Sequence, residues 1–203
     1  MRKLIGTLVL SALFSGLALA QSSSASHTVT VKVPPVLALS LNATDFLFDF
    51  TVQGTGSLTV GGDTYPLATE PNYLDFLDTA TTQLFAPTSV AGAGGDLFGT
   101  LSVRTNQGGW TLKLSSITGT LSAPLANNRV HVFLVKAGGP AVTIPVGTPT
   151  PIAQNLTLAQ ISTGGEGKRT FNLYYLLQMD AADAFPTTTY NGQITVSYLA
   201  TAP

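Results

Sequence analysis

The feature that most constrains this chain is a two-residue alternation of apolar and polar side chains. It is clearest over residues 97–117, where Val103 precedes a polar Asn-Gln-Gly-Gly stretch and Trp110 and Leu112 follow it. A period of two places successive side chains on opposite faces of an extended strand and buries one face. Asparagine and glycine supply the positive φ angles of a tight turn, so we predict a β-hairpin turning at residues 106–109, with Trp110 buried.

The same alternation recurs between Gly- and Pro-rich turns, with hardly any helical period. The predicted strands are residues 27–33, 36–41, 46–52, 57–60, 83–90, 97–105, 110–117, 129–136, 170–179 and 187–199. The irregular stretch 64–82 is predicted as a loop with room for one short helix. About ten short strands separated by turns predict an all-β protein, a single Ig-like or jelly-roll-like β-sandwich spanning residues 27–203.

The first twenty residues have the pattern of a signal peptide. Arg2 and Lys3 form a basic start, an apolar run follows, and the Ala-Leu-Ala at 18–20 fits a cleavage site before Gln21. A membrane anchor is the alternative, but the basic start and the cleavage site favour removal. We therefore expect a secreted or cell-surface protein whose mature chain has no transmembrane segment and begins with a disordered stretch at 21–26.

Composition narrows the classes of partner. The chain has no cysteine, so an exported domain of this sequence is expected to depend on its core for stability. Charged residues make up 9 % of the chain, with 9 basic and 10 acidic side chains and no basic patch, so nucleic acid is not an expected partner. A weakly charged surface is compatible with close packing in a filament or surface layer.

The first predicted strand, residues 27–33, places Val29, Val31 and Val33 on one face and runs into Pro34-Pro35. Proline cannot donate a ladder hydrogen bond, so the pair marks an edge strand or a break. Two arrangements remain open. The strand folds back into its own sheet, or it inserts into a neighbouring copy as a donated strand.

Residue types that carry catalysis are scarce. His27 lies at the expected mature N-terminus, which leaves His131, inside a predicted strand, as the candidate base of a Ser-His-Asp triad. Two carboxylate pairs in predicted loops are formal candidates for a glycosidase, and the second also for a calcium site: Asp75 with Asp78, and Asp180 with Asp183. The two distant histidines argue against zinc. We expect a non-catalytic protein without a cofactor or metal, and a secreted hydrolase is the less favoured reading.

Aromatic side chains offer another kind of site. Tyr65, Tyr73, Tyr174 and Tyr198 could stack on the sugar rings of a glycan, although tyrosines at alternating strand positions are more often half-buried. A carbohydrate- or peptidoglycan-binding module is therefore the alternative function.

The segment GTLSVRTNQGGWTL at 99–112 resembles the WxL domain, a cell-wall-associated β domain of secreted bacterial surface proteins. Trp110 and Leu112 match the W-x-L of that family. The resemblance implies a β fold and attachment to peptidoglycan.

The end of the chain is similar to the second motif of the same family. Tyr190, Ile194 and Thr195 fit this motif, whereas Val196 stands where a second tryptophan belongs and Tyr198 replaces a leucine. This ending also resembles the last strand of exported pilin-like and biofilm-matrix sandwich proteins, a resemblance that implies polymerisation through a donated N-terminal strand.

Together these patterns favour a secreted, non-catalytic structural protein of the cell surface. It is expected to act by self-assembly into a fibre or surface layer, or by association with the cell wall. The expected partners are further copies of the chain or a cell-wall glycan.

Overall fold

The computed structural model describes residues 28, 30–123, 125–183 and 192–203. This part of the chain contains thirteen β-strands and one α-helix. Residues 34–203 form one unit, which is described here by itself, and residues 1–33 form another. Thr28 and residues 30–33, the described residues of the predicted strand at 27–33, are not part of a strand. The predicted signal peptide, the stretch 21–26, Val29 and Tyr190 lie outside the described residues.

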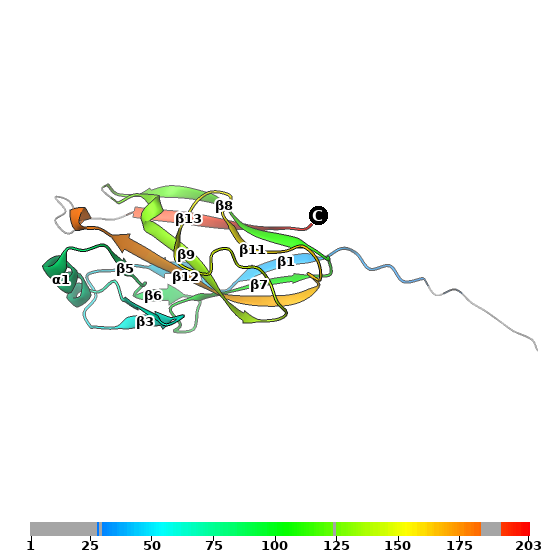
Figure 1. Ribbon diagram of the computed structural model, residues 1–203, viewed down its shortest axis with the longest axis horizontal. Helices are drawn as coiled ribbons and strands as arrows, with labels where there is room; N and C mark the ends of the chain where they lie inside the picture. Colours follow the sequence, from blue (N-terminus) through cyan, green and yellow to red (C-terminus); the bar gives the residue numbers. More distant parts are fainter. Residues whose placement is uncertain (1–27, 29, 124, 184–191) are drawn as a thin grey trace, which may run out of the picture. The chain divides into compact units, whose positions relative to one another are not determined.

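The larger sheet is built around β12 (Gly167–Met179) and is antiparallel throughout (Figure 1). Its strand order is β1 (Leu37–Leu41), β7 (Gly99–Thr105), β12, β9 (Val130–Gly138) and β10 (Thr150–Pro151), and β5 (Gln83–Phe85) pairs with the end of β12.

The smaller sheet has the order β11 (Thr157–Ile161), β8 (Trp110–Leu121) and β13 (Gly192–Thr201). Gly192 is opposite Leu121 in the register, with a φ of 141°. A Cβ atom there would lie 2.6 Å from the carbonyl oxygen of Thr120, so the close approach of two strands requires glycine.

The main core lies between the two sheets, which makes the fold an all-β sandwich as the alternation predicted. Trp110, Leu112 and Leu114 of β8 contribute one side and are all buried. The other side comes from the predicted inward face of β12 and from β7 and β9: Phe171, Leu173, Tyr175, Leu177, Leu101, Val103, Val132 and Leu134.

The predicted hairpin at residues 106–109 is wrong. β7 pairs with β1 and β12, whereas β8 pairs with β11 and β13, so the chain crosses from one sheet to the other at this turn. Both strands bury their apolar faces in the same core, and alternation looks the same for a hairpin and for a crossover between sheets.

The second face of the larger sheet is covered by residues 57–86. The hairpin of β3 (Ser57–Val60) and β4 (Asp63–Pro66) brings Tyr65 against Phe133 and Tyr174, which are buried on this face. The expected helix is α1 (Glu70–Thr79), and its buried Phe76 packs on Phe85. No helix in the described residues is long and apolar enough to cross a bilayer.

Two predicted strands are shorter than expected. Residues 46–52 contribute β2 (Asp45–Leu47), and residues 83–90 divide into β5 and β6 (Ser89–Ala91), which pairs with β2. Asp49 ends the first of these segments locally, because its carboxylate accepts hydrogen bonds from the backbone N–H and the hydroxyl of Thr51. The same bonds lower the pKa of Asp49.

Candidate functional site

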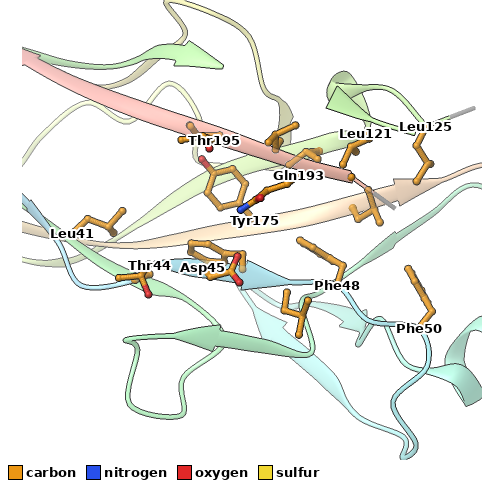
Figure 2. Close-up of a pocket in the computed structure, with 18 of the residues that line it drawn as sticks. Leu41, Thr44, Asp45, Phe48, Phe50, Leu121, Leu125, Tyr175, Gln193 and Thr195 are labelled. Atoms are coloured by element: carbon orange, nitrogen blue, oxygen red, sulfur yellow. The ribbon is translucent and has the colours of Figure 1, made fainter. Parts of the chain in front are cut away.

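An apolar groove of about 520 Å³ opens between the two sheets, along the side where β1, β2 and β13 lie (Figure 2). One wall is formed by residues 41–50 and the other by residues 192–198, with β12 between them. Its main apolar lining residues are Leu41, Ala43, Phe46, Leu47, Phe48, Phe50, Leu121, Leu125, Val130, Leu177, Met179, Ile194 and Val196.

The groove exists because the larger sheet loses its outer strand at this end. β1 ends at Leu41, and the residues that follow supply phenylalanine rings instead of a strand paired with β7. The ring of Phe46 packs edge-on against Tyr175, 4.9 Å between centroids, and Phe50 packs in the same way on Phe85 at 5.1 Å. The space between the two sheets is therefore open to solvent beside β13.

Two tyrosines meet beneath this opening. The hydroxyl oxygens of Tyr175 and Tyr198 lie 2.5 Å apart. Burial raises the pKa of Tyr175 well above 10, and it also raises the pKa of Tyr198. One hydroxyl donates to the other and both groups are neutral, so the groove presents no charge at this point and can accept apolar side chains.

The rim of the groove carries a negative charge. Asp45 is exposed there, opposite Gln193 and Thr195 of β13 (Figure 2). Of the described residues that line the groove, Asp45 alone carries a charge. The arrangement favours binding of an extended apolar segment with a positive charge near its edge.

β13 presents an open edge to the groove. It pairs with β8 along its whole length, and no strand in the described part of the chain pairs with its other side. Its ten residues, GQITVSYLAT, include no charge and no proline. Natural edge strands are usually protected by such residues, and an unprotected edge is a template for another strand.

The residues before Pro34 present an apolar face to solvent. The described valines of the predicted donor segment, Val31 and Val33, are 76 % and 72 % exposed. Two β-branched side chains at alternate positions, both exposed, are typical of a strand that still lacks its partner.

His131 lies against an amide side chain. It is buried in β9, and its Nε2 donates to Oε1 of Gln178 at 2.9 Å, because Nε2 of Gln178 itself donates to Asp180. Burial lowers the pKa of His131. The group next to the imidazole is thus an amide, which cannot act as a nucleophile.

The two carboxylate pairs have different surroundings. Asp75 and Asp78 are exposed on α1, not in the predicted loop. Asp180 and Asp183 do come together, but both form ion pairs with Arg129, at 3.5 Å for Asp183. The two carboxylates therefore face a cationic side chain, and the described residues contain no cluster of three metal-ligating side chains.

The residues of the W-x-L-like motif are part of the core. Trp110 is 2 % exposed and donates from Nε1 to the carbonyl oxygen of Gly165 at 3.1 Å. Leu112 is fully buried. Of the second motif, Ile194 lines the groove and Thr195 is exposed beside it.

The four tyrosines considered for glycan stacking do not lie together. Tyr65 and Tyr174 are buried against Phe133, and Tyr73 packs between Phe50 and Phe76. The hydroxyl of Tyr198 is hydrogen-bonded to the hydroxyl of Tyr175. The rings are half-buried or buried sheet and helix residues, as the strand pattern favoured.

The sequence predicts residues 27–33 as a strand that either folds back or is donated, and it does not predict the groove. The FLFDF run at 46–50 is a sequence signal of an apolar surface. The open edge of β13 has no such signal in the sequence, because an edge strand and a central strand show the same alternation. A scan of protein-family models and searches of curated proteins and solved structures find no match for this chain.

Proposed function

We propose that this chain is an exported, non-catalytic structural protein of the cell surface that polymerises by strand donation. Residues 27–33 of one copy lie along β13 of the next and place Val29, Val31 and Val33 in its groove. The observation that carries the proposal is the apolar groove beside the uncharged, unpaired edge of β13.

The geometry of the two partners agrees. Seven extended residues span about 23 Å and the ten residues of β13 about 33 Å, so the edge accommodates the whole segment. An added strand alternates its side chains, which directs the valines to the groove and Thr28, Thr30 and Lys32 to solvent. Val31 and Val33 then bury surface that is exposed in the single copy.

Charge supports the same pairing. The segment carries His27 and Lys32 and no acidic residue, and the groove carries Asp45 on its rim. Attraction between such groups contributes mainly to the rate and the register of association, while the buried valines contribute the affinity.

Export and assembly are tested with the full-length gene. N-terminal sequencing of the product from a bacterial host is expected to begin at Gln21. Negative-stain microscopy of this product is expected to show filaments. Retention of residues 1–20 would refute cleavage of a signal peptide, and a monomer at all concentrations would refute self-assembly.

Strand donation is tested with two lysine substitutions of equal charge. Val31→Lys places an ammonium group in the apolar groove and is expected to abolish filaments. Thr30→Lys places it on the outward face and is expected to retain them. Filaments of normal length from both variants would rule out donation by this segment.

A mixing experiment tests the groove as the acceptor. The Val31→Lys chain keeps its own groove, so it can accept a strand but cannot donate one. Added to the parent chain at about one part in ten, it is expected to shorten the filaments severalfold, because each incorporated copy ends a filament. Unchanged lengths would contradict a head-to-tail chain of donated strands.

A further inference from the structure

The side chains of Asn106 and Thr105 hold the residues that lead into β1 in line. Oδ1 of Asn106 accepts the N–H of Val36 at 2.7 Å, and its Nδ2 donates to the carbonyl oxygen of Pro34 at 2.8 Å. The backbone N–H of Asn106 and the hydroxyl of Thr105 donate to the carbonyl oxygen of Val36, at 3.2 and 2.7 Å. The side-chain amide thus continues the ladder of β7 where its backbone turns away to the smaller sheet.

The fit between this amide and the segment is specific. Pro34 and Pro35 have no N–H. The backbone groups that bond to Asn106 are therefore one acceptor, the carbonyl oxygen of Pro34, and one donor, the N–H of Val36. A primary amide offers one donor and one acceptor side by side. The bonds hold residues 34–36 extended along the direction of β1.

This direction matters because the donor segment could otherwise enter the groove of its own chain. β1 from Leu37 to Leu41 spans about 16 Å, and the seven residues 27–33 span about 23 Å, so the segment is long enough to run back along β1 to its own groove. A reversal would have to occur at Pro34–Val36. Proline fixes φ near −65°, which excludes the tight type I′ and II′ turns at the proline pair, and Asn106 opposes any wider turn.

We infer that Asn106 is a positioning residue for assembly, which directs the segment before Pro34 away from its own groove and leaves that groove for a second copy. This inference rests on the proposed strand donation and adds what makes the donation intermolecular. Insertion of the segment into its own groove would give monomers that cannot accept a strand. A segment held extended before Pro34 gives filaments, because it inserts into the next copy.

The experiment uses full-length chains with two introduced cysteines, since the natural sequence has none. Thr30→Cys lies on the outward face of the donor segment, and Thr195→Cys is exposed on β13. Under mild oxidation, insertion into a second copy gives a ladder of disulfide-linked multimers on a non-reducing gel. Self-insertion gives a monomer with an internal bridge. A Thr30→Cys, Gln160→Cys chain, with its second cysteine exposed on the far strand β11, is the background control.

In the Thr30→Cys, Thr195→Cys background, Asn106→Ala is expected to raise the ratio of internal to intermolecular bridges about tenfold, through loss of the two amide hydrogen bonds. Asn106→Asp keeps the acceptor for Val36 and loses the donor to Pro34, so an intermediate ratio is expected. Asn72→Ala is the matched control, because its amide also donates to two backbone carbonyls, those of Gly56 and Leu67. That variant is expected to leave the ratio unchanged, although it lowers the unfolding midpoint.

The outcomes separate the two proposals. A multimer ladder that Asn106→Ala does not change overturns the role of Asn106 and leaves strand donation standing. Internal bridges as the main product of the parent background overturn the inferred exit direction. No bridge above the Gln160→Cys background overturns strand donation to β13 and, with it, the inference.

Discussion

The guanidinium of Arg169 lies over the indole ring of Trp110, with 5.9 Å between Cζ and the ring centroid. Both side chains donate to the same acceptor, the carbonyl oxygen of Gly165, at 2.6 Å from Nη1 of Arg169 and 3.1 Å from Nε1 of Trp110. Arg169 is 1 % exposed and also donates to the carbonyl oxygens of Gly164 and Glu166. A buried charge is thus stabilised by peptide dipoles and by an aromatic face, and it ties the 164–167 turn to the core.

We expect Arg169→Met to destabilise the fold by about 3 kcal/mol, because the carbonyl groups of Gly164 and Glu166 would lose the guanidinium as their donor and Gly165 would keep only Trp110. Urea unfolding followed by tryptophan fluorescence measures this change. Arg104→Met is the control, since Arg104 is exposed on β7 and its loss is expected to change stability by less than about 0.5 kcal/mol. Equal midpoints for the two variants would contradict the structural role of Arg169.

Trp110→Ala is expected to cost about 3–5 kcal/mol, since it removes the largest buried side chain of the core and leaves a cavity. Calorimetric unfolding of the parent and the variant measures the difference. If both melt at the same temperature, the indole is not packed as described.

Gly192→Ala is expected to destabilise by about 2 kcal/mol, because φ is 141° and the new Cβ would lie 2.6 Å from the carbonyl oxygen of Thr120. Gly147→Ala is the matched control, because the nearest atom to a Cβ there is the carbonyl oxygen of Ile144 at an ordinary 3.7 Å. Thermal melts of the two variants test the close approach of β13 to β8. A larger loss for Gly147→Ala would be inconsistent with it.

Stability is expected to fall as the pH falls through about 6.5, in part through His131. Burial holds the pKa of His131 below its ordinary value of 6.5, so in this range the unfolded chain binds a proton that the folded chain does not. His131→Gln removes this contribution, and the difference between the parent and the variant isolates it from Asp180 and Arg129 nearby. Unfolding midpoints at pH 5 and pH 8 measure it. A pH dependence that is unchanged by the substitution would show that the imidazole titrates normally.

The candidate site was only partly predictable. The alternating valines of 27–33 predict a strand, and the proline pair predicts an edge or a break after it. Neither pattern reports which edge would receive it. The groove depends on β1 ending at Leu41 while β13 runs on beside it, and the amide of Asn106 acts through contacts with residues about seventy positions away.

The sequence by itself determined which residues are extended and which of their faces is buried. The inward positions of β12 and the burial of Trp110 follow from local patterns, because a side chain's own polarity decides whether it faces water. Only the tertiary structure decided which sheet each strand joins. Strand pairing is made by backbone groups that are the same in every residue, so the separation of β7 from β8 and the open edge of β13 arise from packing of the whole core.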